Sequence, residues 1–381
     1  MKKLVLLFIV IALLASKGIA QNQPLYGLAS LGGPSGEGTL FKVNQNGTGF
    51  SVLHNFQSPA GFYPMGNLLQ ASDGNLYGSC HEGGMYASCT IFKYNPVTSN
   101  YTDVYDFDIT NGDFPKSGLI EGPAGKLYGV ASSGGVTGNG VIYSYDMNTN
   151  TYTPEYSFGS GNNGSLPYGS PILVGSMLYG MTSSNIINGS GILYSYDISS
   201  KTFSELFIFG GSYGKSPMGS LLSANNGKLY GMTKDGGANN YGIIFSYDLS
   251  NGIFTNLYDF DSVNGANPWG GLTESSSGIL YGMTYQGGND NSGVIFSFNL
   301  SGNIYSKLFD FSPIVSGTGT LPQGNLMVDN AGVLYGMTSS GGGREVELLL
   351  PLTHLITHLQ NFLILILRPW AQILMEVSFW A

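Results

Sequence analysis

The stretch LYGMTKDGGANNYGIIFSYD, residues 229–248, recurs in nearly the same form at residues 280–299 and in weaker forms along the chain. The tyrosine of its Leu-Tyr-Gly motif returns at five intervals of 51 residues and a last one of 54, at Tyr26, Tyr77, Tyr128, Tyr179, Tyr230, Tyr281 and Tyr335. A phenylalanine and a proline follow in each of the first six repeats, at Phe56, Phe107, Phe158, Phe209, Phe260 and Phe311 and at Pro64, Pro115, Pro167, Pro217, Pro268 and Pro322. A fixed period near 50 residues predicts a repeat architecture.

One repeat divides into four expected strands, at residues 219–224, 228–233, 243–248 and 253–260. The Asn-Gly pair at 226–227 tolerates the positive φ that a tight hairpin turn requires. The repeats lack the 3.6-residue apolar period of helices. Each repeat is therefore predicted to form a four-stranded antiparallel sheet, with almost no helix between repeats.

A four-stranded unit of this length is typical of a β-propeller blade, whereas β-helix coils are much shorter and leucine-rich repeats need another leucine pattern. Seven motif tyrosines predict an all-β, seven-bladed propeller over residues 21–343. Because blades pack face to face, 13% aromatic residues suit the spaces between them, and the 58 glycines suit turns and close backbone contacts.

The pattern LYG-x-T/S-x-x-GG, followed by G-x-I/L-F/Y-x-Y-D, L-Y/F-D-F and P-x-G-x-L, resembles the Gloeo/Verruco (GloVer) tandem repeat of secreted and surface bacterial proteins. It also looks like a kelch blade, in which Gly-Gly ends one strand and Tyr-Asp ends the next. The resemblance covers residues 25–342, with one departure where Asn185 and Ile186 replace Gly-Gly. It implies export and a C-terminal anchor or sorting module, and it implies no particular reaction.

The first twenty residues, MKKLVLLFIVIALLASKGIA, have a basic start, an apolar core too short to span a bilayer comfortably, and small residues before a cleavage point after Ala20. This pattern is typical of a secretory signal peptide, residues 1–20. A retained membrane anchor is the alternative. We expect a secreted or cell-surface protein, periplasmic or extracellular, with no transmembrane span once the signal peptide is removed.

Residues 344–381 form a tail that contains no glycine and breaks the repeat pattern. If codons are read one base out of frame from Asn361 onward, they permit L-F-D-F-D-F-A-T-V-G-A-N-P-Y-G-G-L-L-L-G, which matches the repeat LYDFDSVNGANPWGGL at residues 257–272. Several positions are forced, such as the glycine encoded across Trp370 and Ala371. Residues 345–361 likewise permit G-V-I-F-S-F-D-P and T-F-T-K. We therefore interpret the tail as an out-of-frame reading of the last blade, by sequencing error or by mutation.

The frame shift affects whether the ring can close. No first strand precedes Leu25, and the restored frame would supply one at the C-terminal end that can pair into the first blade. The chain as written would leave sheet edges open, which favours aggregation. A broken, non-functional chain is therefore one of the possibilities.

Residues identical in every repeat are expected to serve the blade, and residues that vary at one repeat position on one face are freer to serve a ligand. The loop between strands two and three (the 2–3 loop) and the loop from strand four to the next blade (the 4–1 loop) should share one face. The variable residues there are our ligand candidates, namely Tyr63, Met65, Phe114, Lys116, Tyr168, Met218, Tyr241, Trp269 and Gln323. Exposed aromatic rings can stack on sugars or anchor a protein partner. The alternative is that these rings fill gaps between blades.

Cys80 and Cys89 flank one 2–3 loop, and Cys89 takes the place of a glycine in other repeats. In an exported protein two such changes on facing strands suggest a disulfide, with two free thiols as the alternative.

Other sites have weaker support in the sequence. Asp106, Asp108, Asp259 and Asp261 suggest a weak possibility of Ca²⁺, but an EF-hand spacing is missing and turn capping suits them better. GGSYGKS at 210–216 is one residue short of a phosphate-binding loop, and the histidines show no triad or zinc spacing. A net charge of −9 without basic clusters excludes a nucleic-acid partner.

We therefore expect an exported β-propeller that acts as a non-catalytic binding or interaction module, with no cofactor and an unidentified glycan or protein as its partner. The alternative is a propeller-type carbohydrate-active enzyme, a lyase or hydrolase, with its site at the mouth of the axial channel.

Overall fold

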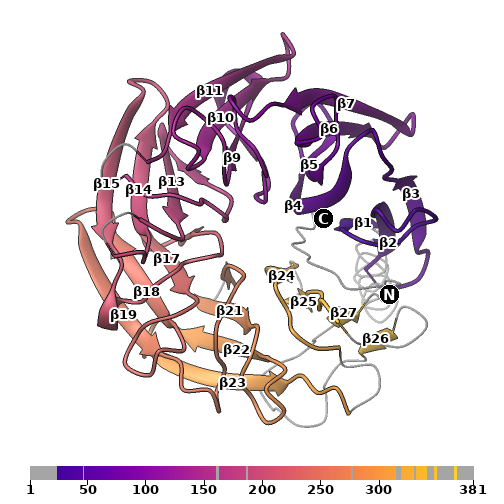
Figure 1. Cartoon of the computed structure of the whole chain (residues 1–381). Helices are drawn as coiled ribbons and strands as arrows, with labels where there is room; N and C mark the ends of the chain where they lie inside the picture. The colour runs from indigo at the N-terminus through magenta and orange to yellow at the C-terminus, as the bar shows by residue number, and fades with distance from the viewer. Residues whose placement is uncertain are drawn as a thin grey trace, which may run out of the picture.

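The computed structural model describes residues 24–45, 47–159, 163–185, 188–275, 278–314, 319–329 and 332–340, and the backbone of two further strands at 347–349 and 364–366. The expected signal peptide and nearly all of the tail after residue 343 lie outside the described residues. β-sheets follow one another around a central axis (Figure 1), and the prediction of an all-β propeller is confirmed.

The first repeats form three sheets. Their strands are β1 Pro24–Ala29, β2 Thr39–Asn44 and β3 Ser51–Asn55; β4 Phe62–Gln70, β5 Leu76–Glu82, β6 Cys89–Asn95 and β7 Asn100–Phe107; and β8 Ile120–Glu121, β9 Lys126–Ala131, β10 Val141–Asp146 and β11 Thr151–Ser157. Three further four-stranded sheets comprise β12 Ile172–Val174, β13 Met177–Thr182, β14 Ile192–Asp197 and β15 Thr202–Ile208; β16 Leu222–Ser223, β17 Lys228–Thr233, β18 Ile243–Asp248 and β19 Ile253–Asp259; and β20 Thr273–Glu274, β21 Ile279–Thr284, β22 Val294–Asn299 and β23 Ile304–Asp310.

Two small sheets complete the described structure, and they pair β24 Met327–Val328 with β25 Leu334–Tyr335 and β26 Glu347–Leu349 with β27 Ile364–Ile366. Among the described residues five sheets have four strands and the first has three, and two-stranded sheets follow them, so the propeller is present while seven complete blades are not described. Within the described residues the first sheet begins at β1 and has no strand inside it.

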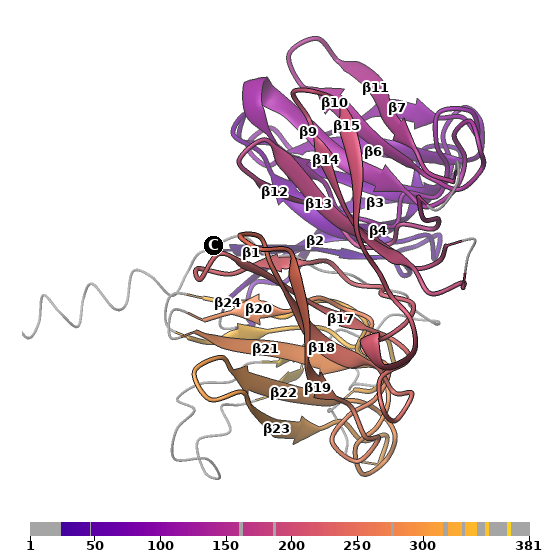
Figure 2. The same cartoon turned by 90° about the vertical axis from the view of Figure 1, so that its left-hand side faces the viewer.

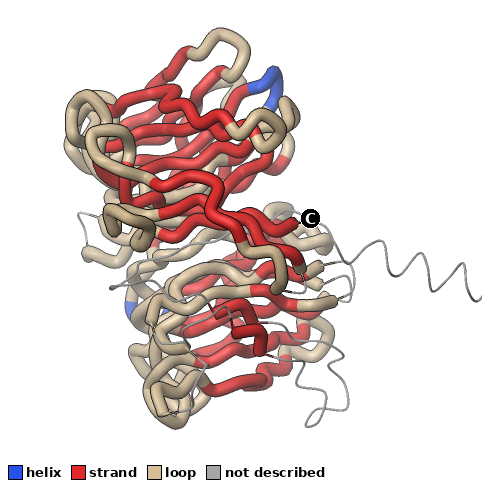
Figure 3. The backbone as a smooth tube through the Cα atoms, turned by 90° about the vertical axis from the view of Figure 1, so that its right-hand side faces the viewer, coloured by secondary structure: helices blue, strands red, loops and turns tan. Residues whose placement is uncertain are grey.

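Every four-stranded sheet is an antiparallel meander with its strands in chain order. The first strand lies nearest the axis and the fourth lies outermost (Figure 1), and Figure 2 shows the same sheets from the side. Helix within the described residues is confined to two three-residue 3-10 turns, Pro123–Gly125 and Gly211–Tyr213 (Figure 3), as predicted.

The glycine of Leu-Tyr-Gly makes room for an aromatic ring of the third strand. Gly231 pairs with Phe245, and a Cβ atom on Gly231 would lie 2.5 Å from the ring carbon Cζ of Phe245. Gly282 and Phe296 repeat this arrangement at 2.6 Å. The motif glycine therefore fixes how closely the ring packs against the neighbouring strand.

The aspartate that ends the third strand caps the turn to the fourth. Asp146 accepts hydrogen bonds at Oδ1 from the backbone N–H groups of Asn148 at 2.9 Å and Thr149 at 3.2 Å. Asp197 and Asp248 make similar bonds to the residues that follow them. These are Asx turns, so the repeated Tyr-Asp is a structural signal.

Seven hydrophobic clusters of the described residues each join two neighbouring sheets. One of them packs Leu25 and Phe41 of the first sheet with Tyr335 and Met337 at the end of the described repeats. The two ends of the repeat region are therefore packed against each other.

Parallel aromatic pairs link the outer strands of successive sheets. Their ring centroids lie 3.8–4.1 Å apart with interplanar angles of 2–3°, in the pairs His54–Tyr101, Tyr105–Tyr152, Tyr156–Phe203, Phe207–Phe254 and Tyr258–Tyr305. The aromatic content of the sequence therefore serves contacts between blades, as expected.

Candidate functional site

The 2–3 and 4–1 loops lie on one face of the propeller, as predicted, because their backbones pair directly. Isolated antiparallel bridges join the two loops in five repeats, at Asp113–Ser133, Ser165–Ser184, Lys215–Asp235, Ala266–Gln286 and Thr320–Ser340. We call this surface the loop face.

The residue before each loop proline has a left-handed backbone although it is not glycine. Its φ lies between 52° and 57° at Tyr63, Phe114, Leu166, Ser216, Asn267 and Leu321. This residue also connects two repeats, since the N–H of Asn267 donates to the Tyr241 carbonyl at 2.9 Å and its carbonyl accepts from the N–H of Tyr285 at 3.3 Å. Backbone in this region is strained and persists where surrounding contacts hold it.

The chain then passes the axis in close contact with its neighbours. A Cβ atom on Gly219 would collide with the backbone of Gly270, and one on Gly270 would collide with Gly324. Hydrogen bonds also run from repeat to repeat, as from the N–H of Ser170 to Oγ of Ser220 at 2.9 Å. This packing gives the residue that follows each proline a rigid base beside the axis.

A first group of candidate side chains meets on the loop face near the axis. The ammonium group of Lys116 lies 4.8 Å from the centre of the Tyr168 ring. The ring of Phe114 lies 4.7 Å from the imidazole of His81, at an interplanar angle of 30°. His81 lies in β5, Phe114 and Lys116 lie in the loop between β7 and β8, and Tyr168 lies in the loop between β11 and β12. We call these four residues the Lys116 cluster.

Burial dominates the charge state of this cluster. It lowers the pKa of His81 to about 4, with help from the nearby positive charge of Lys116. Glu82 lies 3.6 Å from Nδ1 of His81 and would favour the imidazolium, but its side chain is 42% exposed, so solvent weakens its effect below that of burial. Burial also lowers the pKa of Lys116. At neutral pH His81 is therefore uncharged, and Lys116 carries the positive charge of the cluster.

A second group gathers around Trp269. Its ring stacks on Tyr285 with centroids 5.1 Å apart and an interplanar angle of 19°. The ammonium group of Lys234 lies 5.5 Å from the centre of the Trp269 ring. We call these three residues the Trp269 cluster. Each cluster combines a cation with aromatic surface, which is a binding chemistry for sugars and for anionic groups.

The remaining candidates do not join these clusters. Tyr63 packs edge-on against Phe62, Met65 pairs with Ser79 within its own sheet, and Met218 is half-buried. Gln323 is only 8% exposed, which suits a gap-filling role. Tyr241 is 39% exposed and shares its carbonyl with the loop turn.

Sequence reasoning missed His81, Lys234 and Tyr285, which each stand four residues after a motif tyrosine. The other repeats carry serine at that position, at Ser30, Ser132, Ser183 and Ser339. Ser132 and Ser183 donate their hydroxyl groups to the carbonyl before the loop proline, at 2.8 Å and 3.1 Å. The replacement of serine at these three positions was the signal available in the sequence, because it removes this hydrogen bond to the loop.

The expected disulfide is wrong, because both thiols are free and buried. Cys80 pairs with Thr90, so Cys89 points to the opposite side of the sheet. Accordingly Cys80 packs with Leu40 in one cluster and Cys89 packs with Tyr143 in the next. Burial raises the pKa of both thiols.

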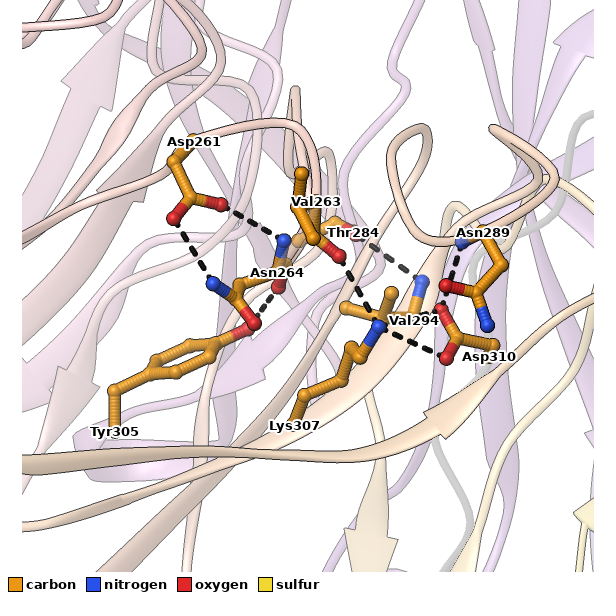
Figure 4. A network of polar contacts seen from close by, with 9 residues as sticks. All are labelled: Asp261, Val263, Asn264, Thr284, Asn289, Val294, Tyr305, Lys307 and Asp310. Atoms are coloured by element: carbon orange, nitrogen blue, oxygen red, sulfur yellow. Dashed lines mark hydrogen bonds and ion pairs between the residues drawn. The ribbon is translucent and has the colours of Figure 1, made fainter.

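Two of the four aspartates considered for Ca²⁺, Asp108 and Asp261, cap their own loops, and Asp259 accepts from the backbone N–H of Ala238 at 2.7 Å. Asp261 accepts hydrogen bonds from the backbone N–H of Asn264 at 2.8 Å and from its side-chain amide at 2.9 Å (Figure 4). Lys307 donates to the Val263 carbonyl at 3.1 Å and pairs with Asp310 at 2.9 Å in the same network. Asp108 is bonded to Asn111 in the same way. Within the part of the chain that the structure describes, no three His, Cys, Asp or Glu residues gather as a metal site.

None of the described residues belongs to a helix that is long and apolar enough to cross a membrane. The sequence profile of the Gloeobacter/Verrucomicrobia repeat matches residues 14–185 and 160–347. No curated protein matches the sequence.

Solved structures share the fold at low identity. The extracellular domain of a protein described as a one-component system, BT4673 from B. thetaiotaomicron, is 15% identical with a TM-score of 0.57, over 87% of this chain and 41% of that chain. A protein described as a 6-phosphogluconolactonase from Bacteroides uniformis is 16% identical with a TM-score of 0.53, over 81% and 87%. TolB from Acinetobacter baumannii is 17% identical with a TM-score of 0.47, over 76% of this chain and 64% of TolB. The two likenesses with TM-scores above 0.5 concern the fold alone.

Proposed function

The chain belongs to the Gloeobacter/Verrucomicrobia repeat family, and from that premise we propose that it is an exported binding module whose ligand sits on the loop face beside the propeller axis. The observation that carries this proposal is the pair of cation–aromatic clusters around Lys116 and Trp269. Lys116, Tyr168 and Trp269 occupy a position that varies in every repeat, whereas His81, Lys234 and Tyr285 stand where other repeats keep a structural serine. All of them rest on backbone that the inter-repeat bonds hold rigid. Such preorganised aromatic surface favours binding.

Export is supported by the signal-peptide pattern of residues 1–20. N-terminal sequencing of the protein recovered from outside the cytoplasm should begin at Gln21. A full-length chain retained in the membrane would contradict this part of the proposal.

We also propose that the ring has seven blade positions, the last of them incomplete. The support is the set of seven inter-sheet clusters, one of which joins the first and last described repeats. Low-resolution density of the purified chain should show seven sectors, and a six-fold ring would contradict the proposal.

The test of binding uses Trp269, which is the one tryptophan among the described residues. Glycan and protein panels are titrated into the full chain while tryptophan fluorescence is recorded. A ligand of this site should change the emission of the parent chain and leave that of Trp269→Phe unchanged. Equal responses from both chains, or affinity that survives alanine at both Tyr168 and Trp269, would overturn the proposal.

A lyase is the second candidate, because neutral His81 lies in the Lys116 cluster and could accept a proton. Incubation with uronate polysaccharides would then produce an unsaturated sugar with ultraviolet absorbance, and His81→Gln would abolish it. Binding without any such product favours the module.

A further inference from the structure

Lys116 carries a charge that nothing in the described part of the protein neutralises. Its side chain is half-buried, and no carboxylate oxygen of the described residues lies within 4.0 Å of its ammonium nitrogen, the distance that defines an ion pair. By contrast, Lys201 pairs with Glu155 at 2.7 Å and Lys307 pairs with Asp310. Removing an ammonium group from water without a counter-ion is unfavourable. Binding of an anion next to Lys116 would therefore be favourable.

Lys234 repeats this arrangement on the other cluster. No ion pair of the described residues includes it, and its ammonium group lies over Trp269. The chain has a net charge of −9, so carboxylates are plentiful, yet both lysines meet aromatic rings instead. What Lys116 and Lys234 share is an ammonium group over an aromatic ring, at two points of the same face, and this shared arrangement points to one kind of ligand.

We propose that the ligand is an acidic saccharide, whose pyranose ring packs on Tyr168 or Trp269 while its carboxylate pairs with Lys116 or Lys234. This inference rests on the proposed function, because it names the chemical class that the same site takes. The C–H face of a pyranose suits an aromatic ring, and a carboxylate beside that ring suits an ammonium group. A neutral sugar would leave the half-buried ammonium unpaired.

Rings and cations must act together for this class of ligand. An acidic peptide would satisfy the lysines but would not require stacking, and a neutral glycan would satisfy the rings but not the lysines. The pairing of one ring with one cation in each cluster favours the carboxylated sugar over both.

The experiment measures the affinity of the full chain for oligogalacturonate, for its methyl ester and for poly-glutamate by calorimetry. We expect oligogalacturonate to bind and its methyl ester to bind at least about tenfold more weakly, since a hydrogen bond to a charged group is lost. Lys116→Met and Lys234→Met should each weaken binding of the acid by about tenfold and barely change binding of the ester.

Lys215→Met is the matched control, because Lys215 is an exposed lysine of the same loop face that lies outside both clusters. It should bind oligogalacturonate as the parent chain does, and thermal unfolding of every variant verifies that it is folded. Equal affinity for acid and ester, or unchanged affinity in the folded Lys116→Met and Lys234→Met chains, would overturn the acidic-saccharide inference.

The outcomes separate this inference from the proposed function. If a neutral glycan binds and Trp269→Ala abolishes its binding, the site stands and the acidic class fails. If poly-glutamate binds as tightly as oligogalacturonate, the saccharide class fails. If no compound binds with dependence on Tyr168 or Trp269, both the inference and the proposed site fail.

Discussion

Tyr143 and Tyr194 each bury a hydroxyl group for which the described residues offer no hydrogen-bond partner. Other repeats place phenylalanine at the same position, at Phe41, Phe92, Phe245 and Phe296. We expect Tyr143→Phe and Tyr194→Phe to leave stability unchanged or to raise it by about 1 kcal/mol, because an unsatisfied buried polar group is unfavourable. Thermal unfolding measures the effect.

Phe245→Tyr is the matched control, and it should destabilise the protein by roughly 1–3 kcal/mol by adding the same unpaired hydroxyl. If both tyrosine replacements lower the melting temperature clearly, then the hydroxyl groups have partners and our account of this repeat position fails.

His81 should give stability a pH dependence of known sign. Its pKa is about 4 in the folded protein, where burial disfavours the imidazolium, and 6.5 as the reference for an exposed side chain. Between these values the unfolded chain binds a proton that the folded chain does not, so stability falls as the pH falls from 6.5 to 4. Denaturant titrations across this window should therefore show a smaller loss for His81→Gln than for the parent chain.

NMR titration of the imidazole gives an independent measurement. His54 remains in both chains, so its own lowered pKa cancels in the comparison. A resonance of His81 that titrates near pH 6.5 would show that Glu82 or solvent governs this group instead of burial.

At the scale of the element, the turn before each loop proline is the joint between repeats. Leu166 adopts φ of 57° there and is 36% exposed, so its side chain contributes little packing to offset a strained backbone. Asparagine tolerates this conformation better and occurs at the equivalent Asn267. We expect Leu166→Asn to stabilise the protein by roughly 0.5–1 kcal/mol, as judged by chemical denaturation.

The control for this turn is Leu166→Val, since a β-branched residue tolerates positive φ least. It should lower stability, and equal effects of valine and asparagine would mean that side-chain contacts decide the outcome at this position.

At the scale of the whole molecule, the series of stacked outer rings stops at both ends of the repeat region. Phe309 and Phe50 occupy the next positions at the two ends of this series, but neither is stacked on a parallel ring. In the described structure Phe309 packs edge-on against Phe311, and Phe50 packs at a tilt against Phe41. Phe50 is 43% exposed. The frame proposed for the tail would supply a phenylalanine for each of them, in T-F-T-K and in L-F-D-F.

We therefore predict that a chain with the frame restored after about residue 343 melts at a higher temperature and aggregates less than the present chain. DNA sequencing across codons 335–381 is the first measurement, and an added or missing base is expected there if the shift is a sequencing error. If the DNA sequence is unchanged, the shift is a genuine mutation in the gene, and the stability of the restored chain then tests the proposed last blade.

Phe50→Ala serves as the control in both chains. It should cost about 1–3 kcal/mol more in the restored chain than in the present one, because only there would the ring be stacked. Equal losses, or a restored chain that is no more stable, would contradict the proposed last blade.

How much was predictable differs between these scales. The strands around Tyr230 were predicted at 228–233 and 243–248, and they lie there, because alternation and Asn-Gly turns are local signals. The first strand was predicted over 219–224 but spans Leu222–Ser223, since the close approach of Gly219 to Gly270 at the axis depends on the neighbouring repeat. The disulfide failed for a related reason, because the side of the sheet that Cys89 faces follows from its register.

The sequence by itself determined the repeat, the propeller fold, the loop face and the rings that fill the spaces between blades, because each of these follows from periodicity within about 50 residues. Only the tertiary structure decided which variable residues meet. Lys116 and Tyr168 come from different loops, and so do Lys234 and Trp269, and the approach of their side chains depends on how adjacent blades pack. The sequence of one loop does not show which residue of another loop it will contact, which is why the site appears only once the ring is assembled.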